Sequence, residues 1–357
     1  MKIVTVVGAR PQFIKAAAMS RALVDAGGFE EVVVHTGQHH DTEMSQVFFD
    51  QLGMSPPRHQ LGISGGTHGS MTGRMLEGVE RVLIQERPDA TLVYGDTNST
   101  LAGAIAAAKL QIPVAHVEAG VRSFERSMPE EVNRVLVDSV SSLLFCPTQT
   151  AVGHLAAEGI RRGVHLVGDV MLDVAIKRAA AAHSDILKTM GLFHGEYLVC
   201  TCHRQANTDV RDRLVGILDA LDEIAAHIPV VFPLHPRTAK AIASHGLTES
   251  LGRLRVVPPL PYEEMLLLVR SARGVATDSG GLQKEAFFHR VPCITLRDET
   301  EWPETVSLGW NILAGSDTAR IVAAANALDT LPKREGTPFG DGHAAMSIAA
   351  ILSDFRR

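Results

Sequence analysis

Aromatic residues, cysteines and long hydrophobic segments are all scarce in this sequence of 357 residues. Phe, Trp and Tyr make up only 5% of the chain, which is few for a surface that stacks on nucleic-acid bases. The basic residues are not gathered into runs, and the formal net charge is −6. No apolar run reaches the length needed to span a membrane. Neither nucleic acid nor a membrane is therefore an expected partner.

The four cysteines indicate reduced thiols in a cytoplasmic protein. Cys146, Cys200, Cys202 and Cys293 all fall in or beside expected strands. Cys200 and Cys202 point to one face, but no second pair completes a zinc site, so no metal is expected. The apolar run over residues 3–7 is too short for a secretory signal. We therefore expect a cytoplasmic location.

What the sequence does contain is a regular alternation of strand, polar turn and helix. The ranges expected as strands are 2–7, 31–36, 90–95, 112–117, 142–146, 164–167, 196–201, 229–234, 254–257, 273–277 and 292–296. Helical periodicity fills the gaps, for example over 13–23, 71–85, 101–110 and 263–269, and one long helix is expected over 170–190. This alternation is typical of α/β folds with parallel sheets and helices on both faces.

The length of the chain and a break after the sixth strand predict two doubly wound domains. The join is expected near Gly168, which assigns residues 1–167 to the first domain and 168–341 to the second. The last helix, expected over 344–355, follows a loop with several glycines and is predicted to cross back, so residues 342–357 belong to the first domain. Charged or imidazole side chains follow nearly every strand. Because ligands bind beyond the carboxyl ends of parallel strands, this predicts a polar cleft between the domains.

Glu118 and Glu130 are the first candidates for acid/base groups. Glu118 ends an apolar strand and Glu130 opens a helix, and two carboxylates facing one cleft suit acid/base chemistry at a single carbon. Structural alternatives remain open for both helix starts. Glu130 can complete a capping box with Ser127 or form an ion pair with Arg134 one turn later. Asp96, after another strand, can simply cap a helix.

The turn after the first strand suits an anion rather than a dinucleotide. Residues 8–11 contain one glycine where a dinucleotide fingerprint needs three, so no nicotinamide cofactor is expected. Arg10 and Lys15 flank a helix start, where backbone N–H groups favour an anion. The alternative is a solvated turn arginine and an ordinary helix lysine.

Residues 277–285 form a second candidate for phosphate binding. Its two glycines allow close approach of a ligand, Ser279 can cap the following helix, and Glu285 is placed to accept hydrogen bonds from ribose hydroxyls. The alternative is a plain capped turn. The pairs His203-Arg204 and His235-Pro236-Arg237 each follow an apolar strand, and together they favour a diphosphate site.

Six motifs occur in a fixed order along the chain: Gly8-Ala9-Arg10-Pro11-Gln12-Phe13-Ile14-Lys15, Tyr94-Gly95-Asp96-Thr97, His116-Val117-Glu118-Ala119-Gly120, Pro129-Glu130-Glu131-Val132-Asn133-Arg134, His203-Arg204, and Asp278-Ser279-Gly280-Gly281 through Glu285. Together they resemble the bacterial non-hydrolysing UDP-N-acetylglucosamine 2-epimerases over nearly the whole chain. The resemblance implies a glycosyltransferase-B-like architecture of two Rossmann-like domains around a central cleft, and a homodimer. It also implies that the second domain holds UDP and that the amino sugar faces the first.

The resemblance implies a division of roles among the candidate residues. Asp96, Glu118 and Glu130 would carry protons, with His203 and Lys15 in the same catalytic group. Binding of the UDP-amino sugar is implied for Arg10, Arg134, His235, Arg237, Ser279, Gly280, Gly281 and Glu285. No cofactor and no metal are implied.

The implied reaction converts UDP-N-acetylglucosamine into UDP-N-acetylmannosamine. The hydrogen at C2 is not acidic, because no carbonyl adjoins it, so it leaves only as UDP departs from C1 to give a 2-acetamidoglucal. UDP then returns while a proton reaches C2 from the opposite face. This reaction needs a base, an acid and cations that hold the diphosphate. The product would serve the synthesis of surface polysaccharides.

Two alternatives to this substrate and activity remain. The Gln12-Phe13 pair, the short link over residues 122–128 and residues 299–302 resemble more closely the branch that acts on UDP-2,3-diacetamido-2,3-dideoxyglucuronate. A glycosyltransferase of the same architecture is the further alternative, disfavoured by the three acids. Ala206 stands where the family often has Glu, and His40-Asp41-Thr42 does not fit the family's activator-binding segment, so activation by substrate is not expected.

Overall fold

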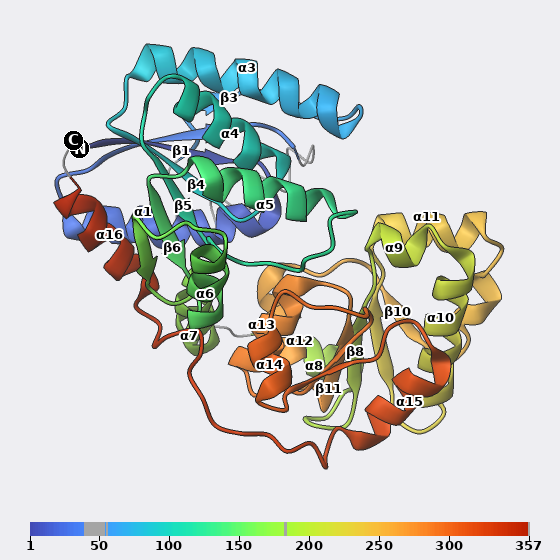
Figure 1. Ribbon diagram of the computed structural model, residues 1–357. Helices are drawn as coiled ribbons and strands as arrows, with labels where there is room; N and C mark the ends of the chain where they lie inside the picture. The colour runs from blue at the N-terminus through green and yellow to red at the C-terminus, as the bar shows by residue number, and fades with distance from the viewer. Residues whose placement is uncertain (39–53, 55, 182–183, 356–357) are drawn as a thin grey trace. The chain divides into compact units, whose positions relative to one another are not determined.

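The computed structural model describes residues 1–38, 54, 56–181 and 184–355. The chain forms two compact units, which consist of Met1–Val174 with Thr337–Arg357 and of Ala175–Gly336. Each unit is built on a parallel sheet (Figure 1). The fold class predicted from the sequence, with two Rossmann-like parallel α/β units, is confirmed.

The sheet of the first unit has seven parallel strands in the order β3-β2-β1-β4-β5-β6-β7. The strands are β1 (Lys2–Val7), β2 (Glu30–His35), β3 (His59–Gln60), β4 (Ala90–Tyr94), β5 (Val114–Val117), β6 (Leu143–Cys146) and β7 (Val164–Leu166). The helices are α1 (Arg10–Ala26), α3 (His68–Glu86), α4 (Asn98–Lys109), α5 (Pro129–Val140), α6 (Gln149–Ala157), α16 (Ala344–Asp354) and α7 (Val170–Ala181), which continues into the second unit. Helices α3, α4 and α5 cover one face of this sheet, and α1 with α16 covers the other (Figure 1).

The sheet of the second unit has six parallel strands in the order β10-β9-β8-β11-β12-β13. The strands are β8 (Leu198–Thr201), β9 (Val230–Pro233), β10 (Arg255–Val257), β11 (Gly274–Thr277), β12 (Cys293–Thr295) and β13 (Asn311–Leu313). The helices are α8 (Ile186–Met190), α9 (Gln205–Thr208), α10 (Arg211–Ala225), α11 (Pro236–Ser244), α12 (Tyr262–Arg270), α13 (Gly280–Phe288), α14 (Pro303–Ser307) and α15 (Thr318–Ala327), with a 3₁₀ turn over Thr248–Leu251.

The order of strands reverses once in each sheet. In the first unit the reversal lies between β1 and β4, and in the second it lies between β8 and β11. Chains that leave neighbouring strands at such a point turn to opposite faces of the sheet, and the space between them is the usual ligand site of an open parallel sheet. The strands at each reversal and those next to them are therefore the ones expected to position a ligand site.

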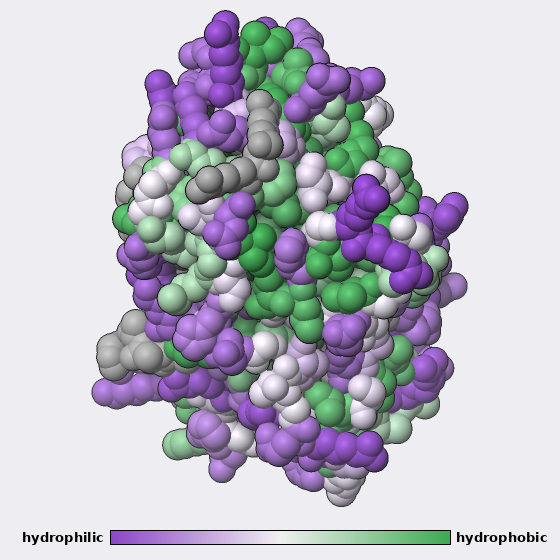
Figure 2. Space-filling model, turned by 60° about the vertical axis from the view of Figure 1, so that its left-hand side comes forward, coloured by the Kyte–Doolittle hydropathy of each residue, from purple (hydrophilic) through white to green (hydrophobic). Residues whose placement is uncertain are grey.

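The central strands are almost wholly apolar because helices cover both faces of each sheet. In β1 the side chains of Ile3, Val4, Val6 and Val7 are completely buried. Helix α16 packs beside α1 and joins the end of the chain to this core (Figure 1). The hydrophobic residues that remain at the surface are interspersed with hydrophilic ones on the face drawn in Figure 2.

The first turn of α7 belongs to the first unit through contacts with the chain around α16. The N–H of Asp169 donates to the carbonyl of Phe339 (2.8 Å). The carboxylate of Asp173 accepts from the N–H groups of Ala344 (3.1 Å) and Ala345 (2.7 Å), at the start of α16. These contacts explain why the units divide after residues 174 and 336, whereas the sequence placed the joins after residues 167 and 341.

All eleven strands expected from the sequence are present, with ends displaced by no more than two residues. The two strands not expected, β3 and β13, have only two and three residues and lie at the edges of their sheets. The single long helix expected over 170–190 is wrong, because α7 ends at Ala181 and α8 begins at Ile186. The Oγ of Ser184 accepts from the N–H of Ile186 (3.1 Å), which starts a separate helix.

All four cysteines are free and buried, as expected. Burial raises the pKa of the Cys146 and Cys293 thiols to about 12, so they stay protonated at neutral pH. Among the described residues, no helix combines the length and hydrophobicity needed to cross a bilayer.

We expect the protein to lose stability in mild acid because of the buried imidazole of His289, at the end of α13. Burial, assisted by the charge of Arg270, lowers its pKa from 6.5 to about 4. Between these values the unfolded chain binds the extra proton and the folded chain does not, so stability is lost as the pH falls from 6.5 toward 4. Between pH 6.5 and pH 4 the free energy of unfolding of wild type should fall by about 3 kcal/mol more than that of His289→Gln, as measured by thermal unfolding. Parallel pH profiles would contradict this role.

Candidate active site

The turn between β1 and α1 is fixed by the carboxamide of Gln12. Its Oε1 accepts from the N–H groups of Gly8 (2.8 Å) and Ala9 (3.0 Å), while its Nε2 donates to the carbonyl of Tyr94 (2.9 Å). These bonds hold the ends of β1 and β4 together at the point where the strand order reverses. Lys15 follows one turn later in α1 and is buried.

Glu118 lies directly after β5 in a left-handed backbone conformation, with φ of 72°. This conformation is uncommon for a residue other than glycine and persists where neighbours fix it. The N–H groups of Glu118 and Ala119 both donate to the carbonyl of Phe145 (3.1 and 3.0 Å). In this position Oε1 of Glu118 lies 2.6 Å from Nζ of Lys15, and the two side chains are only 13% and 8% exposed.

Asp96 follows β4, next to the Glu118–Lys15 pair. A Cβ added to Gly95 would lie 3.5 Å from Oε1 of Glu118 and 3.6 Å from Nζ of Lys15, so the backbone beside Asp96 closely approaches both charged groups. Helix α4 is capped by Thr97 rather than by Asp96. The helix-cap alternative for Asp96 is therefore wrong.

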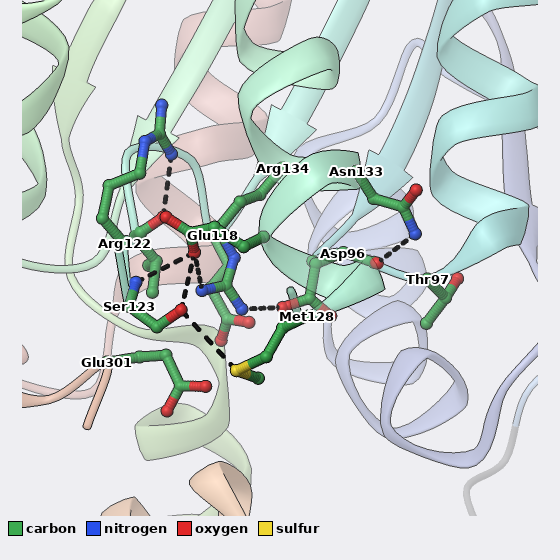
Figure 3. Close-up of polar contacts among 12 residues, drawn as sticks. Asp96, Thr97, Glu118, Arg122, Ser123, Met128, Asn133, Arg134 and Glu301 are labelled. Atoms are coloured by element: carbon green, nitrogen blue, oxygen red, sulfur yellow. Dashed lines mark hydrogen bonds and ion pairs between the residues drawn. The ribbon is translucent and has the colours of Figure 1, made fainter. Parts of the chain in front are cut away.

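Helix α5 supplies the cation that binds Asp96 (Figure 3). Arg134 donates through Nη2 to the carboxylate of Asp96 and through Nη1 to Oε2 of Glu131 (2.8 Å). The carboxylate of Glu131 also accepts from the N–H and Oγ of Ser123 and from the N–H of Phe124, each at 2.9 Å. Glu131 thus ties the chain after β5 to the helix that presents Arg134.

Glu130 lies half-buried in the first turn of α5 and forms no hydrogen bond or ion pair with the described residues. The N-cap of α5 is Met128, without a side-chain cap, so the capping box with Ser127 is not formed. Arg134 contacts Glu131 instead of Glu130. Neither structural alternative for Glu130 is realised.

Two residues of this site, Glu131 and Asn133, were not among those expected from the sequence. The Nδ2 of Asn133 donates to the backbone carbonyl of Asp96 (2.8 Å), as Figure 3 shows. A usable signal was present, because Glu131, Arg134 and Asp138 fall at helical spacing on one face of α5. All three are buried, so this face carries charge into the protein rather than toward solvent.

Each of the two best-placed carboxylates has its own cation. Lys15 lies beside Glu118, and Arg134 binds Asp96. Lys15, Glu118 and Pro147 are among the residues that line a small pocket in the first unit. Carboxylates at the ends of neighbouring strands can take up and return protons, and their cations can stabilise negative charge on a ligand.

In the second unit, Asp278 joins the two turns at the reversal between β8 and β11. Its carboxylate is completely buried and accepts from the N–H groups of His203 (3.0 Å) and Arg204 (2.9 Å) and from Nδ2 of Asn207 (3.1 Å). Asp278 was expected only as part of the motif over 277–285. In the structure, Asp278 fixes the turn that carries His203.

The imidazoles of His203 and His235 lie side by side, with ring centroids 5.4 Å apart. His235 caps α11, since its Nδ1 accepts from the N–H of Arg237 (3.2 Å). The exposed side chain of Arg237 forms an ion pair with Asp209 (3.1 Å). The ends of β8 and β9 thus bring together three of the residues expected to bind phosphate.

Ser279 caps α13, its Oγ accepting from the N–H of Leu282 (3.4 Å). Gly280 and Gly281 are the first two residues of this helix, and Glu285 lies half-buried further along it. Backbone N–H groups at the start of such a helix favour an anion.

The expected site residues divide between the two units. The first unit holds Lys15, Asp96, Glu118, Glu130 and Arg134, and the second holds His203, His235, Arg237, Ser279, Gly280, Gly281 and Glu285. The side chain of Arg10 lies outside the described residues, as does the segment over residues 40–42. No group of three or more His, Cys, Asp or Glu that suits a metal ion occurs within the described ranges.

Comparisons with known proteins agree on one family. A family model described as UDP-N-acetylglucosamine 2-epimerase matches residues 21–353. The UDP-2,3-diacetamido-2,3-dideoxy-D-glucuronate 2-epimerase of Pseudomonas aeruginosa is 49% identical over 362 residues, and a UDP-N-acetylglucosamine 2-epimerase homolog of Methanococcus maripaludis is 46% identical over 358 residues. Both matches cover 99% of each chain. The crystal structure of the Methanocaldococcus jannaschii UDP-GlcNAc 2-epimerase, in complex with UDP-GlcNAc and UDP, superimposes with a TM-score of 0.93 at 39% identity, covering 99% of this chain and 100% of that one.

Proposed function

The chain belongs to the UDP-N-acetylglucosamine 2-epimerase family, and from this premise we propose that it inverts C2 of a UDP-2-acetamido sugar by eliminating and re-adding UDP. The observation that carries the proposal is the pairing of Glu118 with Lys15 and of Asp96 with Arg134 at neighbouring strand ends. A reaction that removes a proton from one face of a carbon and returns one to the other needs two such groups.

The chemistry gives the acids of the first unit different tasks. As UDP leaves C1, a carboxylate takes the C2 hydrogen, and a 2-acetamidoglucal results. A second acid then delivers a proton to the opposite face of C2 while the diphosphate adds back to C1. Glu118 and Asp96 are the proton carriers best supported by their contacts, and Glu130 is the third acid within the same unit.

The second unit has the groups needed to hold the nucleotide. His203 and His235 lie together, and the capped start of α13 offers N–H groups to a phosphate. Arg237 is the exposed cation of this group. Glu285, on α13, is proposed to accept from the ribose hydroxyls. Because these residues would bind UDP, the diphosphate could separate from C1 while UDP stays bound to the enzyme.

Two UDP-amino sugars compete as substrate, UDP-N-acetylglucosamine and UDP-2,3-diacetamido-2,3-dideoxyglucuronate. The relative named for the second sugar is 49% identical to this chain, whereas a relative named as a homolog of the enzyme for the first is 46% identical and the Methanocaldococcus jannaschii enzyme named for the first is 39% identical. The higher identity favours a serious test of the diacetamido sugar. One kinetic assay with both sugars separates them by the ratio of their kcat/KM values.

The proposal also includes the location of the enzyme, the use of its product and its oligomeric state. A cytoplasmic enzyme would draw on the cellular pool of UDP-sugars, and its product would supply surface polysaccharides. The working form is proposed to be a homodimer.

The proposal predicts that turnover in D₂O places deuterium at C2 of the product. We expect nearly complete labelling, because the proton that returns comes from solvent-exchanged carboxylates. Proton NMR of the recovered sugars measures it. Fully protonated product would overturn the elimination mechanism, and sugar transferred to an acceptor without exchange at C2 would favour a glycosyltransferase.

A further inference from the structure

A completely buried His–carboxylate pair lies behind the two turns that carry Glu118 and Asp96. The pair consists of His116, in β5, and Asp138, in the last turns of α5. The Nδ1 of His116 lies 2.7 Å from Oδ1 of Asp138, and both side chains are 0% exposed. The proposed chemistry uses neither residue, and neither was among the expected site residues.

One side of this pair holds the turn before Asp96. The Nε2 of His116 lies 2.8 Å from the carbonyl oxygen of Gly95. Gly95 is in the left-handed region, with φ of 61°, and directly precedes Asp96. The orientation of the Gly95 peptide sets the direction in which Asp96 leaves the strand, so the imidazole acts on the carboxylate through the backbone.

The other side of the pair holds the turn after Glu118. The Oδ2 of Asp138 accepts from the N–H of Gly120 (3.0 Å) and from Nη1 of Arg122 (2.7 Å). Gly120 has φ of 75°, and a Cβ there would lie 2.4 Å from the carbonyl oxygen of Ala151. The turn that places Glu118 is therefore held at its far end by the same carboxylate that binds His116.

The contacts also favour the ionised form of Asp138. Both nitrogens of His116 face oxygens, one on the carboxylate of Asp138 and one on the carbonyl of Gly95. Burial alone would raise the pKa of Asp138, but its hydrogen bonds and charge interactions with His116 and Arg122 outweigh burial and lower the pKa. The buried carboxylate is thus stabilised by the groups packed around it.

We propose that His116 and Asp138 are positioning residues for the epimerisation, which set the separation and orientation of the Asp96 and Glu118 carboxylates by holding the two turns that bear them. This inference rests on the proposed function. Because misplacing a catalytic group by about 1 Å can cost about 100-fold in rate, loss of the pair should lower kcat strongly without loosening UDP.

The test uses Asp138→Asn and His116→Gln in the full-length protein. For each variant, thermal unfolding followed by circular dichroism gives the fraction of folded chains at the assay temperature, and kcat is expressed per folded active site. A residue that only stabilises the fold would lower this fraction and leave turnover per site unchanged. We expect kcat per site to fall at least about tenfold, with the Kd for UDP within about twofold of wild type.

The chain offers a matched control at the amino end of β1. Glu86 is buried, binds Nε2 of His59 (2.7 Å) and Nζ of Lys2 (2.7 Å), and has its pKa lowered to about 2, but it contacts neither catalytic turn. Glu86→Gln should therefore lower the melting temperature and leave kcat per site unchanged. If one variant of the pair fails to fold, the other decides the question.

A double variant tests whether the two residues act as one unit. If they do, His116→Gln combined with Asp138→Asn should lower kcat per site little more than either change alone. Wild-type turnover per site in the single variants would overturn the proposal. Wild type that exchanges no deuterium at C2 would instead overturn the proposed function, so the two failures are distinguishable.

Discussion

Glu118→Gln is expected to lower turnover of the UDP-sugar by about 1,000-fold, within the range of about 10²–10⁴-fold for loss of a general acid or base. The amide cannot accept the C2 proton, and it leaves the ammonium of Lys15 without the carboxylate that lies 2.6 Å away. Glutamine can adopt the same left-handed backbone at this position, where φ is 72°, at a cost similar to that for glutamate. The change therefore removes the charge and leaves the turn. NMR measurement of epimer formation and of deuterium at C2 checks the result.

Affinity for UDP should be nearly unchanged in this variant, because the residues proposed to hold UDP lie in the second unit. The matched control is Glu77→Gln, which neutralises an exposed carboxylate of α3 in the same unit. It should turn over like wild type. Turnover of Glu118→Gln within about tenfold of wild type would contradict a proton-transfer role, since such a role contributes at least about 100-fold.

Asp96→Asn is expected to lower epimerisation by about 100-fold or more. The substitution removes the carboxylate that accepts from Nη2 of Arg134. The ion pair between Nη1 of Arg134 and Glu131 remains. With Glu118 intact, one face of C2 keeps its proton carrier. We therefore expect the C2 hydrogen to exchange with solvent from only one of the two epimers.

Starting separate reactions in D₂O from each epimer measures this asymmetry. Glu118→Gln should show the opposite preference, which would identify the face of C2 that each carboxylate serves. Glu130→Gln, run beside them, asks whether the third acid shares either role. Exchange from both epimers at wild-type rates in Asp96→Asn would exclude Asp96 as a proton carrier.

The arrangement of the strands was predictable because burial on both faces of a parallel sheet leaves a plain pattern in the sequence. The edge strands β3 and β13 were missed, because their residues, His59–Gln60 and Asn311–Leu313, include polar ones and show no apolar run of strand length. The long helix expected over 170–190 failed for a local reason. Apolar residues recur on both sides of Ser184, but Ser184 and Asp185 are not helical, and the hydroxyl of Ser184 accepts from the N–H of Ile186 at the start of α8.

The positions of the candidate acids were predictable, because each follows a strand or opens a helix; their catalytic roles stay a prediction. Their partners were not predictable. The ammonium of Lys15 is 103 positions from Glu118 in the chain, and Arg134 is 38 positions from Asp96. Which cation meets which carboxylate depends on the order of the strands, and no local spacing contains that information.

By itself the sequence determined the fold class, the succession of strands and helices, and the residue types that stand at the strand ends, since local patterns of burial and turn chemistry encode them. Tertiary structure alone decided how those residues act together. It placed Glu131 and Asn133 against the segments they hold, and it put His116 with Asp138 beside the turns that carry Asp96 and Glu118. The physical reason is that a buried charge survives only where groups from distant segments neutralise it and satisfy its hydrogen bonds, and packing of the whole unit decides which segments those are.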